Sequence, residues 1–226
     1  MISTSKGMDI QDQIPIFDYL THQIEGKTEL LHLAGPMVAN EFARGSKTLG
    51  VMSRPYKISR EVINQLFQNT PLEFEFSTDI QGLVWGSILK NIYVIGWGII
   101  EVLASDNMNL KGIYISKAFA EMVNITKQEG GFKETIYGLS GLGDFMATSL
   151  SIHSHNRIYG MHIASMHKNG ILHDGKVSLP EGHFSLKALT NRYQNNCHCY
   201  PLLNCINNIV FNAIPAHTLI DIIPNS

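Results

Sequence analysis

Lys90 is a charged residue in an otherwise apolar stretch. From Ile80 to Ile100 it is the only charged side chain. The isoleucines around it recur at three- and four-residue spacings, which predicts a helix buried on most of its circumference. Burial disfavours an ammonium group, so such a lysine has a lowered pKa or a carboxylate partner. A lowered pKa fits proton transfer near neutral pH. The residues alone leave a second reading open, in which Lys90 snorkels outward along a wet stripe.

Asp144 and Thr148 form a second candidate pair. They are four residues apart, so a helix would place both on one face. By itself, Asp144 could simply cap the helix that starts after Gly143, a common use of aspartate.

Histidines and cysteines also cluster, which raises the question of zinc. The residues concerned are His153, His155, Cys197, His198, Cys199 and Cys205. No Cys-x-x-Cys pair is present, and Cys-x-Cys is a poor chelate for a closed tetrahedral site. We therefore expect no metal site. We expect reduced thiols of a cytoplasmic protein, packed beneath the last predicted helix. No Gly-x-Ser-x-Gly or Ser/His/Asp set indicates a hydrolase.

The composition is that of an ordinary globular protein. Hydrophobic residues make up 44% of the 226, charged residues 16%, and the net charge is −2. This lacks the basic excess that nucleic acid or an anionic membrane would require. The uncharged runs beside Lys90 are about ten residues each, too short to span a bilayer. The first residues have neither a basic region nor an apolar core, so we expect no secretory signal.

The first 78 residues alternate short strands with helices. Strands are expected at 1–5, 30–34, 48–53 and 72–77, and helices at 14–24, 37–43 and 58–69. This alternation predicts an α/β part with partly parallel strand pairing.

From Asp79 onward only helical segments are expected. They are 80–104, 108–128, 131–138, 144–150, 157–169, 184–195 and 200–211. Thr78 with Gln81 resembles a capping box for the first of them. The sequence thus predicts two domains, an α/β part at 1–78 and an all-helical part at 79–226.

Seven short phrases, in this order, carry a family resemblance. They are Ser5-Lys6-Gly7, Ala34-Gly35-Pro36-Met37-Val38-Ala39-Asn40-Glu41, Leu89-Lys90-Asn91, Ser105-Asp106-Asn107, Gly138-Leu-Ser-Gly-Leu-Gly143-Asp144, Ser154-His155-Asn156-Arg157 and Pro180-Glu181-Gly182. Together, over essentially the whole chain, they resemble the NAD(P)-dependent glycerol-3-phosphate dehydrogenases. The resemblance implies part of a Rossmann-type dinucleotide-binding domain. It also implies an all-helical domain like the C-terminal one of 6-phosphogluconate dehydrogenase, with the active site in the cleft between the two.

The resemblance also implies an activity and residue roles. NAD or NADP would exchange hydride with C2 of a small phosphate substrate, interconverting sn-glycerol 3-phosphate and dihydroxyacetone phosphate as precursors of phospholipids. Lys90 matches the proton-transfer lysine, and Asp144 the carboxylate that orients it. Substrate contacts would come from Lys6, Gly35, Met37, Asn91, Thr148, Ser154, His155 and Asn156. Cofactor contacts would come from Lys6, Ala39, His155, Leu179 and Glu181.

Two positions depart from the family pattern. Met37 replaces a serine, so we expect one hydroxyl contact to be lost. His155 replaces the first arginine of Ser-Arg-Asn-Arg, which grips the substrate phosphate. Histidine is mostly neutral near pH 7, and losing such a charged hydrogen bond costs about 1.5–3 kcal/mol. We predict weak phosphate affinity that rises as the pH falls, with Ser154 and Asn156 remaining and Arg157 as an alternative cation.

The sequence given contains no G-x-G-x-x-G motif, which family members carry in an earlier segment. We expect the first half of the nucleotide domain to be absent and a parallel sheet edge to be open. Three roles then remain: a dehydrogenase completed by an N-terminal fragment, an inactive remnant, or an interaction module that pairs through the sheet edge. A homo-oligomer is a further possibility. Neither nucleic acid nor a membrane span is expected among its partners.

Overall fold

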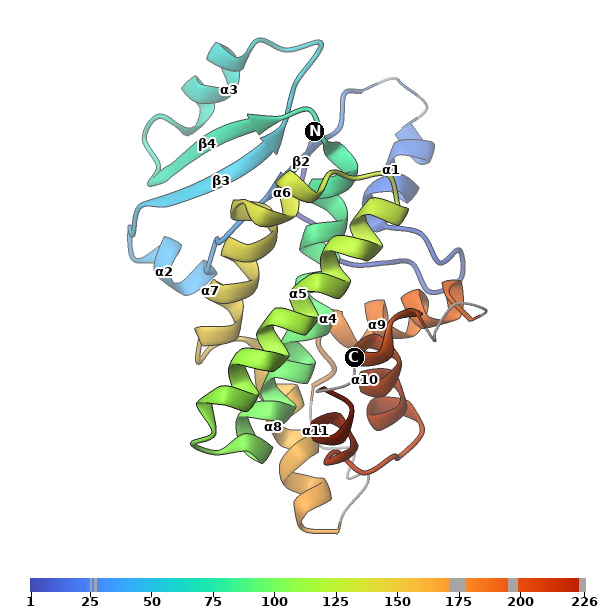
Figure 1. The fold of residues 1–226 in the computed structure, drawn as a ribbon. Coiled ribbons are helices and arrows are strands. Elements are labelled where there is room, and N and C mark those ends of the chain that lie inside the picture. Colours follow the sequence, from blue (N-terminus) through green and yellow to red (C-terminus); the bar gives the residue numbers. More distant parts are fainter. Residues whose placement is uncertain (25, 27, 171–177, 195–198, 224–226) are drawn as a thin grey trace.

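The computed structural model describes residues 1–24, 26, 28–170, 178–194 and 199–223. A small sheet with short helices lies at one end of a longer helical body (Figure 1). This arrangement confirms the predicted order of an α/β part followed by a helical part.

The sheet has four strands in chain order. They are β1 (Ile2–Ser3), β2 (Leu31–Ala34), β3 (Thr48–Ser53) and β4 (Leu72–Ser77). β1 pairs with β2 and β3 with β4 in parallel, whereas β2 and β3 are antiparallel. The prediction of partly parallel pairing is therefore confirmed. The connecting helices are α1 (Ile16–Ile24), α2 (Ala39–Ala43) and α3 (Arg60–Phe67).

The helical part follows directly. Its elements are α4 (Ile80–Ala104), α5 (Met108–Gln128), α6 (Lys133–Tyr137), the π-helix η1 (Leu139–Gly143), α7 (Asp144–Leu150), α8 (His155–Lys168), α9 (Glu181–Arg192), α10 (Pro201–Phe211) and α11 (Thr218–Ile222). No strand occurs beyond residue 78 in the parts of the chain that are described. The predicted helices are all present, with ends shifted by a few residues.

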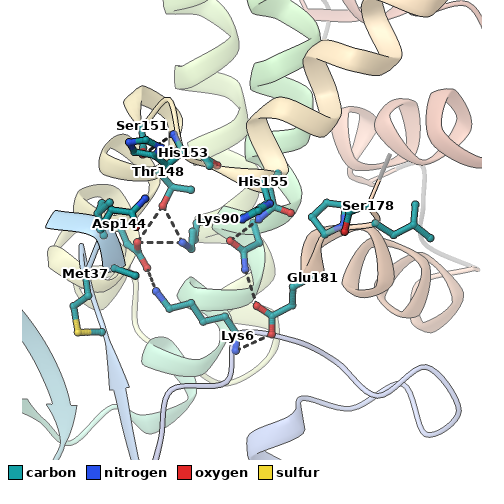
Figure 2. Close-up of a pocket in the computed structure, with 18 residues that line it drawn as sticks. Lys6, Met37, Lys90, Asp144, Thr148, Ser151, His153, His155, Ser178 and Glu181 are labelled. Carbon is teal, nitrogen blue, oxygen red and sulfur yellow. Dashed lines mark hydrogen bonds and ion pairs between the residues drawn. The ribbon is translucent and has the colours of Figure 1, made fainter. Parts of the chain in front are cut away.

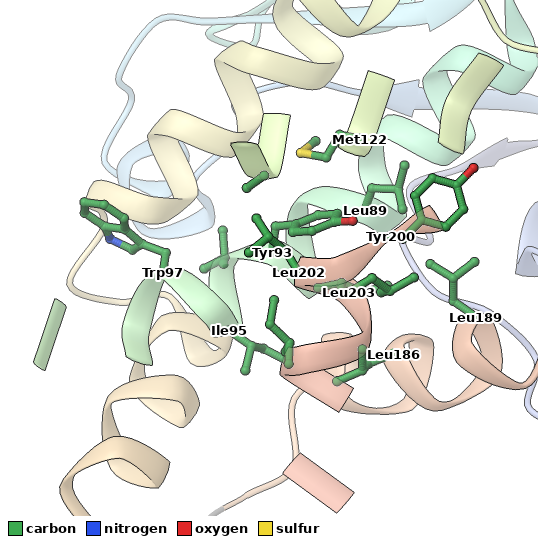
Figure 3. Packing of buried hydrophobic residues seen from close by; sticks show 14 of the residues in the cluster. Leu89, Tyr93, Ile95, Trp97, Met122, Leu186, Leu189, Tyr200, Leu202 and Leu203 are labelled. Atoms are coloured by element: carbon green, nitrogen blue, oxygen red, sulfur yellow. The ribbon is translucent and has the colours of Figure 1, made fainter. Parts of the chain in front are cut away.

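Helix α4 is the core of the protein. Its 25 residues are buried almost throughout, because α5, α8, α9 and α10 pack around it. Figure 3 shows side chains of α4 packed against Leu202 and Leu203 of α10 and Met122 of α5. By length and composition α4 could cross a membrane, but its most apolar window is entirely buried inside the protein. Its hydrophobicity is thus accounted for by the core.

The sheet packs onto the same helix. Leu83 of α4 contacts a small cluster that includes Ala34 of β2 and Val51 of β3. Phe17 of α1 belongs to the main core of the helical part. The two parts therefore share packing across residue 78, and their division into two domains at that point stays a prediction.

Three local features differ from the predictions. The capping box of Thr78 with Gln81 is wrong: Asp79 is the cap of α4, since its Oδ1 accepts from Gly82 N at 2.9 Å. Gln81 instead donates to Asp18. Helices η1 and α11 were not expected.

Candidate active site

Lys90 lies in the middle of α4 and is only 6% exposed. Its Nζ donates to Thr148 Oγ1 at 2.8 Å and lies 3.2 Å from Asp144 Oδ1. Burial lowers the pKa of Lys90 to about 8, while the negative charge of Asp144 limits how far it falls. The outward, snorkelling orientation does not occur.

Asp144 is the first residue of α7, where its carboxylate does not cap the helix. Its Oδ1 accepts from Thr148 Oγ1 at 3.2 Å, and its Oδ2 accepts from Lys6 Nζ at 2.8 Å. Burial alone would raise the pKa of Asp144, but the ammonium groups of Lys90 and Lys6 outweigh it and hold this pKa below its ordinary value. One carboxylate thus joins two lysines from distant parts of the chain (Figure 2).

A second network connects α4, α8 and α9. Asn156 Nδ2 donates to Asn91 Oδ1 at 3.0 Å, and Asn156 Oδ1 accepts from Gly182 N at 3.0 Å. Glu181 accepts from Asn91 Nδ2 at 3.4 Å and from the backbone N of Lys6 at 3.2 Å. Glu181 is therefore held by two elements, rather than standing as a freely solvated carboxylate.

Glycine is the only residue type that fits at position 182, next to Asn156 and Asn91. A Cβ built on it would lie 2.5 Å from Asn156 Oδ1 and 2.6 Å from the Asn91 carbonyl oxygen. Both distances are too short for any side chain, so glycine permits α9 to approach α4 and α8 closely.

These side chains line a pocket of about 540 Å³ (Figure 2). It brings together most of the residues that the resemblance had pointed to: Lys6, Met37, Ala39, Lys90, Asn91, Asp144, Thr148, Ser154, His155, Asn156, Leu179 and Glu181. Their roles remain proposals, since position alone does not assign them.

Gly35 is not among the lining residues. It has a φ of +115°, and a Cβ there would meet the backbone of Gly50 in β3 at 3.4 Å. The turn after β2 accounts for this glycine, and its predicted contact with substrate stays a prediction.

Arg157 does not replace the missing family arginine. Its Nε donates to Glu101 Oε2 at 2.6 Å and its Nη2 to Glu101 Oε1 at 2.5 Å. This bidentate ion pair joins α8 to α4, and Arg157 does not line the pocket. The interpretation of Arg157 as an alternative phosphate ligand is therefore not supported, and His155 lines the pocket instead.

The pocket is also lined by residues that were not predicted from the sequence. They are Val38, Asn40, Ser151, His153, Ser178 and Pro180. His153 had been weighed only as a zinc ligand. Its spacing of two residues from His155, across the helix-capping Ser154, was the signal that could have placed it here.

Nothing in the described residues points to a metal centre. No three His, Cys, Asp or Glu side chains come together there as a metal-binding group. Cys199 is exposed and Cys205 buried, both as free thiols, so of these two the expected packing holds for Cys205 and not for Cys199. Cys197 and His198 lie outside the described residues.

Comparison with known proteins identifies the family. Residues 79–221 match the family model described as the C-terminus of NAD-dependent glycerol-3-phosphate dehydrogenase. The chain belongs to this family. The family binds a small-molecule substrate and uses NAD(P), so the resemblance read from the seven sequence phrases is confirmed.

Individual relatives agree with this assignment. The glycerol-3-phosphate dehydrogenase [NAD(P)+] of Brachyspira hyodysenteriae is 30% identical over 213 residues, which cover 94% of this chain and 64% of that protein. The protein of the same name from Chlorobium chlorochromatii is 28% identical, over 96% of this chain and 65% of its own length. This chain of the dehydrogenase family thus spans slightly less than two thirds of these curated relatives.

Solved structures share the fold. The glycerol-3-phosphate dehydrogenase of Dunaliella salina superposes with a TM-score of 0.84 at 20% identity, over 97% of this chain and 39% of that one. The enzyme of Coxiella burnetii superposes with a TM-score of 0.82 at 19% identity, over 100% of this chain and 68% of that one. The small sheet and helical body of this dehydrogenase family member therefore occur in that arrangement in larger proteins.

Proposed function

We propose that the pocket around Lys90 binds a three-carbon phosphate and takes part in the interconversion of sn-glycerol 3-phosphate and dihydroxyacetone phosphate. The observation that carries the proposal is the Lys90 ammonium group, buried at the pocket between Thr148 and Asp144. A buried lysine with a pKa of about 8 suits a group that must both give and take a proton near neutral pH.

The proton step follows from this geometry. When the ketone is reduced, the Lys90 ammonium gives its proton to the C2 oxygen as that oxygen becomes an alcohol. When the alcohol is oxidised, the neutral Lys90 amine takes the hydroxyl proton. Asp144 keeps Lys90 oriented, and the Thr148 hydroxyl lies within reach of the same amine. The chemistry that a bound nicotinamide dinucleotide supplies is transfer of a hydride to or from C2.

The residues present suit the nicotinamide end of such a cofactor. Lys6, Ala39, Leu179 and Glu181 line the same pocket as Lys90. The Glu181 carboxylate is already held at the rim by the backbone of Lys6 and by Asn91. The acidic or basic residue that distinguishes NAD from NADP follows the G-x-G-x-x-G motif, which the sequence given does not contain, so the choice between the two stays open.

The substrate phosphate would lie against the start of α8. Ser154, His155 and Asn156 line the pocket there, and a helix N-terminus favours an anion. Met37, where the family has a serine, also lines the pocket, but its side chain packs against the sheet cluster and its sulfur lies close to Gly50 of β3. We place this activity in the cytoplasm, in the supply of glycerophospholipid precursors.

The test is oxidation of NADH and NADPH in the presence of dihydroxyacetone phosphate. It is run with the chain alone and with the N-terminal nucleotide-binding half of a relative added. Lys90→Met should abolish any turnover, whereas Lys133→Met, at a half-exposed lysine of α6, should not change it. No turnover in either arrangement, or full turnover in Lys90→Met, would contradict the proposal.

A second candidate role is interaction through the sheet edge. Among the described residues β1 pairs with β2 on one side and has no strand on the other. An open edge of this kind accepts a further strand, from a second copy of the chain or from a complementing N-terminal fragment. Light scattering of the chain, alone and with that fragment, tests this role. A monomer that binds no fragment at any concentration argues against it.

A further inference from the structure

The charged groups of the pocket balance one another. Lys6 and Lys90 contribute two positive charges, and Asp144 and Glu181 contribute two negative charges. Asp144 forms an ion pair with each lysine, so the positive charge of the pair is already offset before a ligand binds. A phosphate monoester carries close to two negative charges at neutral pH. Such a dianion therefore enters a pocket that has no net positive charge to meet it.

Two histidines lie where a positive charge could meet the phosphate, near the start of α8. His153 and His155 are both exposed and both line the pocket; His153 lies on the loop before α8, and His155 is the first residue of α8. Figure 2 shows His153 beside Ser151 and Thr148, and His155 near Lys90. Within the described residues neither imidazole ring makes a hydrogen bond or ion pair, so both rings remain available to a ligand.

We propose that His153 and His155 together form a proton-gated binding site for a phosphate dianion, in which each imidazole takes up a proton as the anion binds. The proposal rests on the proposed function for its substrate, and it adds His153 as a binding residue and pH as the control of affinity. Two protonated imidazoles bring two positive charges, which match the charge of the dianion. An imidazole is the side chain that changes charge between pH 5 and 8.

The other charged groups near the pair do not compete for this role. Lys6 on the loop after β1 and Lys90 on α4 are bound to Asp144 of α7. Glu181, at the start of α9, accepts from Asn91 and from the backbone of Lys6. On α8 itself, Arg157 is tied to Glu101 of α4. Among the described residues, the two imidazoles are thus the titratable groups next to the proposed site that are not already paired and can take up a proton when an anion binds.

The test is calorimetric titration of sn-glycerol 3-phosphate into the full chain without cofactor, in buffers of different ionisation enthalpy at about pH 7.5. The proton uptake per bound ligand is the readout. We expect about two protons for the unchanged chain and about one for His153→Gln or His155→Gln. His22→Gln, at an exposed histidine of α1, is the matched control and should keep the full uptake. The affinity of the unchanged chain should be about tenfold or more higher near pH 6.5 than near pH 8.

Inorganic phosphate serves as a second probe and separates this inference from the proposed function. One outcome is that phosphate binds with proton uptake that depends on His153, while glycerol 3-phosphate does not bind. This result would support the anion site and contradict the proposed substrate. Glycerol 3-phosphate that binds with the same proton uptake in His153→Gln as in the unchanged chain overturns the inference and leaves the substrate standing. Absence of binding by both probes at every pH overturns both.

Discussion

The carboxylate of Asp144 lies 3.2 Å from the ammonium group of Lys90, and these side chains are only 3% and 7% exposed. The second oxygen of the same carboxylate is occupied by Lys6. Two cations therefore depend on one buried anion. Removing the anion leaves both without this counter-charge, whereas removing Lys90 leaves Asp144 still paired with Lys6. This asymmetry governs the first two predictions.

Asp144→Asn should destabilise the protein strongly. The change keeps the shape of the side chain but leaves the Lys90 ammonium buried without a counter-charge, and breaking a buried ion pair in this way costs about 3–5 kcal/mol. Urea unfolding followed by circular dichroism measures the loss in free energy of unfolding. Asp106→Asn, at an exposed turn residue, is the control and should change little. A loss for Asp144→Asn no larger than that of the control would show that the pair is not buried as described.

Lys90→Met should remove a pH-dependent part of the stability. The pKa of Lys90 is about 8 in the folded protein, against about 10.4 in an unfolded chain. Below pH 8 both states are protonated, and burial of the charge destabilises the folded state in full. Between about pH 8 and about pH 10.4 the unfolded state binds more protons, so the stability of the wild type rises with pH. The gain is on the order of 3 kcal/mol.

The difference in free energy of unfolding between the wild type and Lys90→Met isolates this effect, because other titrating groups cancel. The wild type should gain stability relative to Lys90→Met as the pH rises from about 8 to about 10.4. The corresponding difference for Lys133→Met, at a half-exposed position, should stay constant. A pH-independent difference for Lys90→Met contradicts the lowered pKa.

His155→Arg should strengthen phosphate binding. Arginine is charged at every relevant pH and binds a phosphate through two parallel N–H donors, whereas a neutral imidazole offers one. A regained charged hydrogen bond of about 1.5–3 kcal/mol corresponds to a KM for dihydroxyacetone phosphate that is lower by about 10- to 100-fold near pH 8. Steady-state kinetics or ligand titration measures it. His22→Arg is the control for added surface charge, and an unchanged KM in His155→Arg would show that the phosphate lies elsewhere.

Glu121→Ala should destabilise the helical body without touching the pocket. Glu121 is buried and accepts from the Tyr93 hydroxyl at 2.6 Å and from the backbone N of Leu202 and Leu203 at 2.8 and 3.0 Å. It therefore caps α10 from α5 and ties both to α4. Truncation leaves these three buried donors unpaired, at about 1–3 kcal/mol each before relaxation.

Chemical denaturation should show a loss of several kcal/mol for that variant, with a smaller loss for Glu121→Gln, which keeps an acceptor. Glu134→Ala, at a 73% exposed carboxylate, is the control. An equally small effect of Glu121→Ala would mean that the start of α10 does not depend on this carboxylate.

The order of the elements could be predicted from periodicity because each helix and strand buries a regular face. The apolar run of 80–104 predicted α4 nearly to its observed ends. Helix η1 was missed because three glycines in six residues argue against a helix. Gly141 is required there by close packing, since a Cβ on it would lie 2.1 Å from the carbonyl oxygen of Ile136. This contact joins residues only five apart, where α6 turns into η1, and it leaves no periodic apolar signal.

The site was predictable in part for a related reason. A lone lysine in an apolar helix demands a partner, and the family resemblance, rather than residue spacing, pointed to Asp144 with Thr148. The spacing of residues could not show that Lys6 shares the same carboxylate, since 138 positions separate the two in the chain. It also could not show that Arg157 is held by Glu101, 56 residues away, and does not line the pocket.

The most direct test of the account is the titration of the Lys90 amino group by heteronuclear NMR, with lysine labelled at the side chain and the Lys90 signal assigned from Lys90→Met. The measurement needs neither cofactor nor turnover. A pKa of about 8 is expected, because Lys90 is buried at the pocket and Asp144 compensates only part of the cost of burying its charge. A value near 10.4, the ordinary value for an exposed lysine, would contradict it.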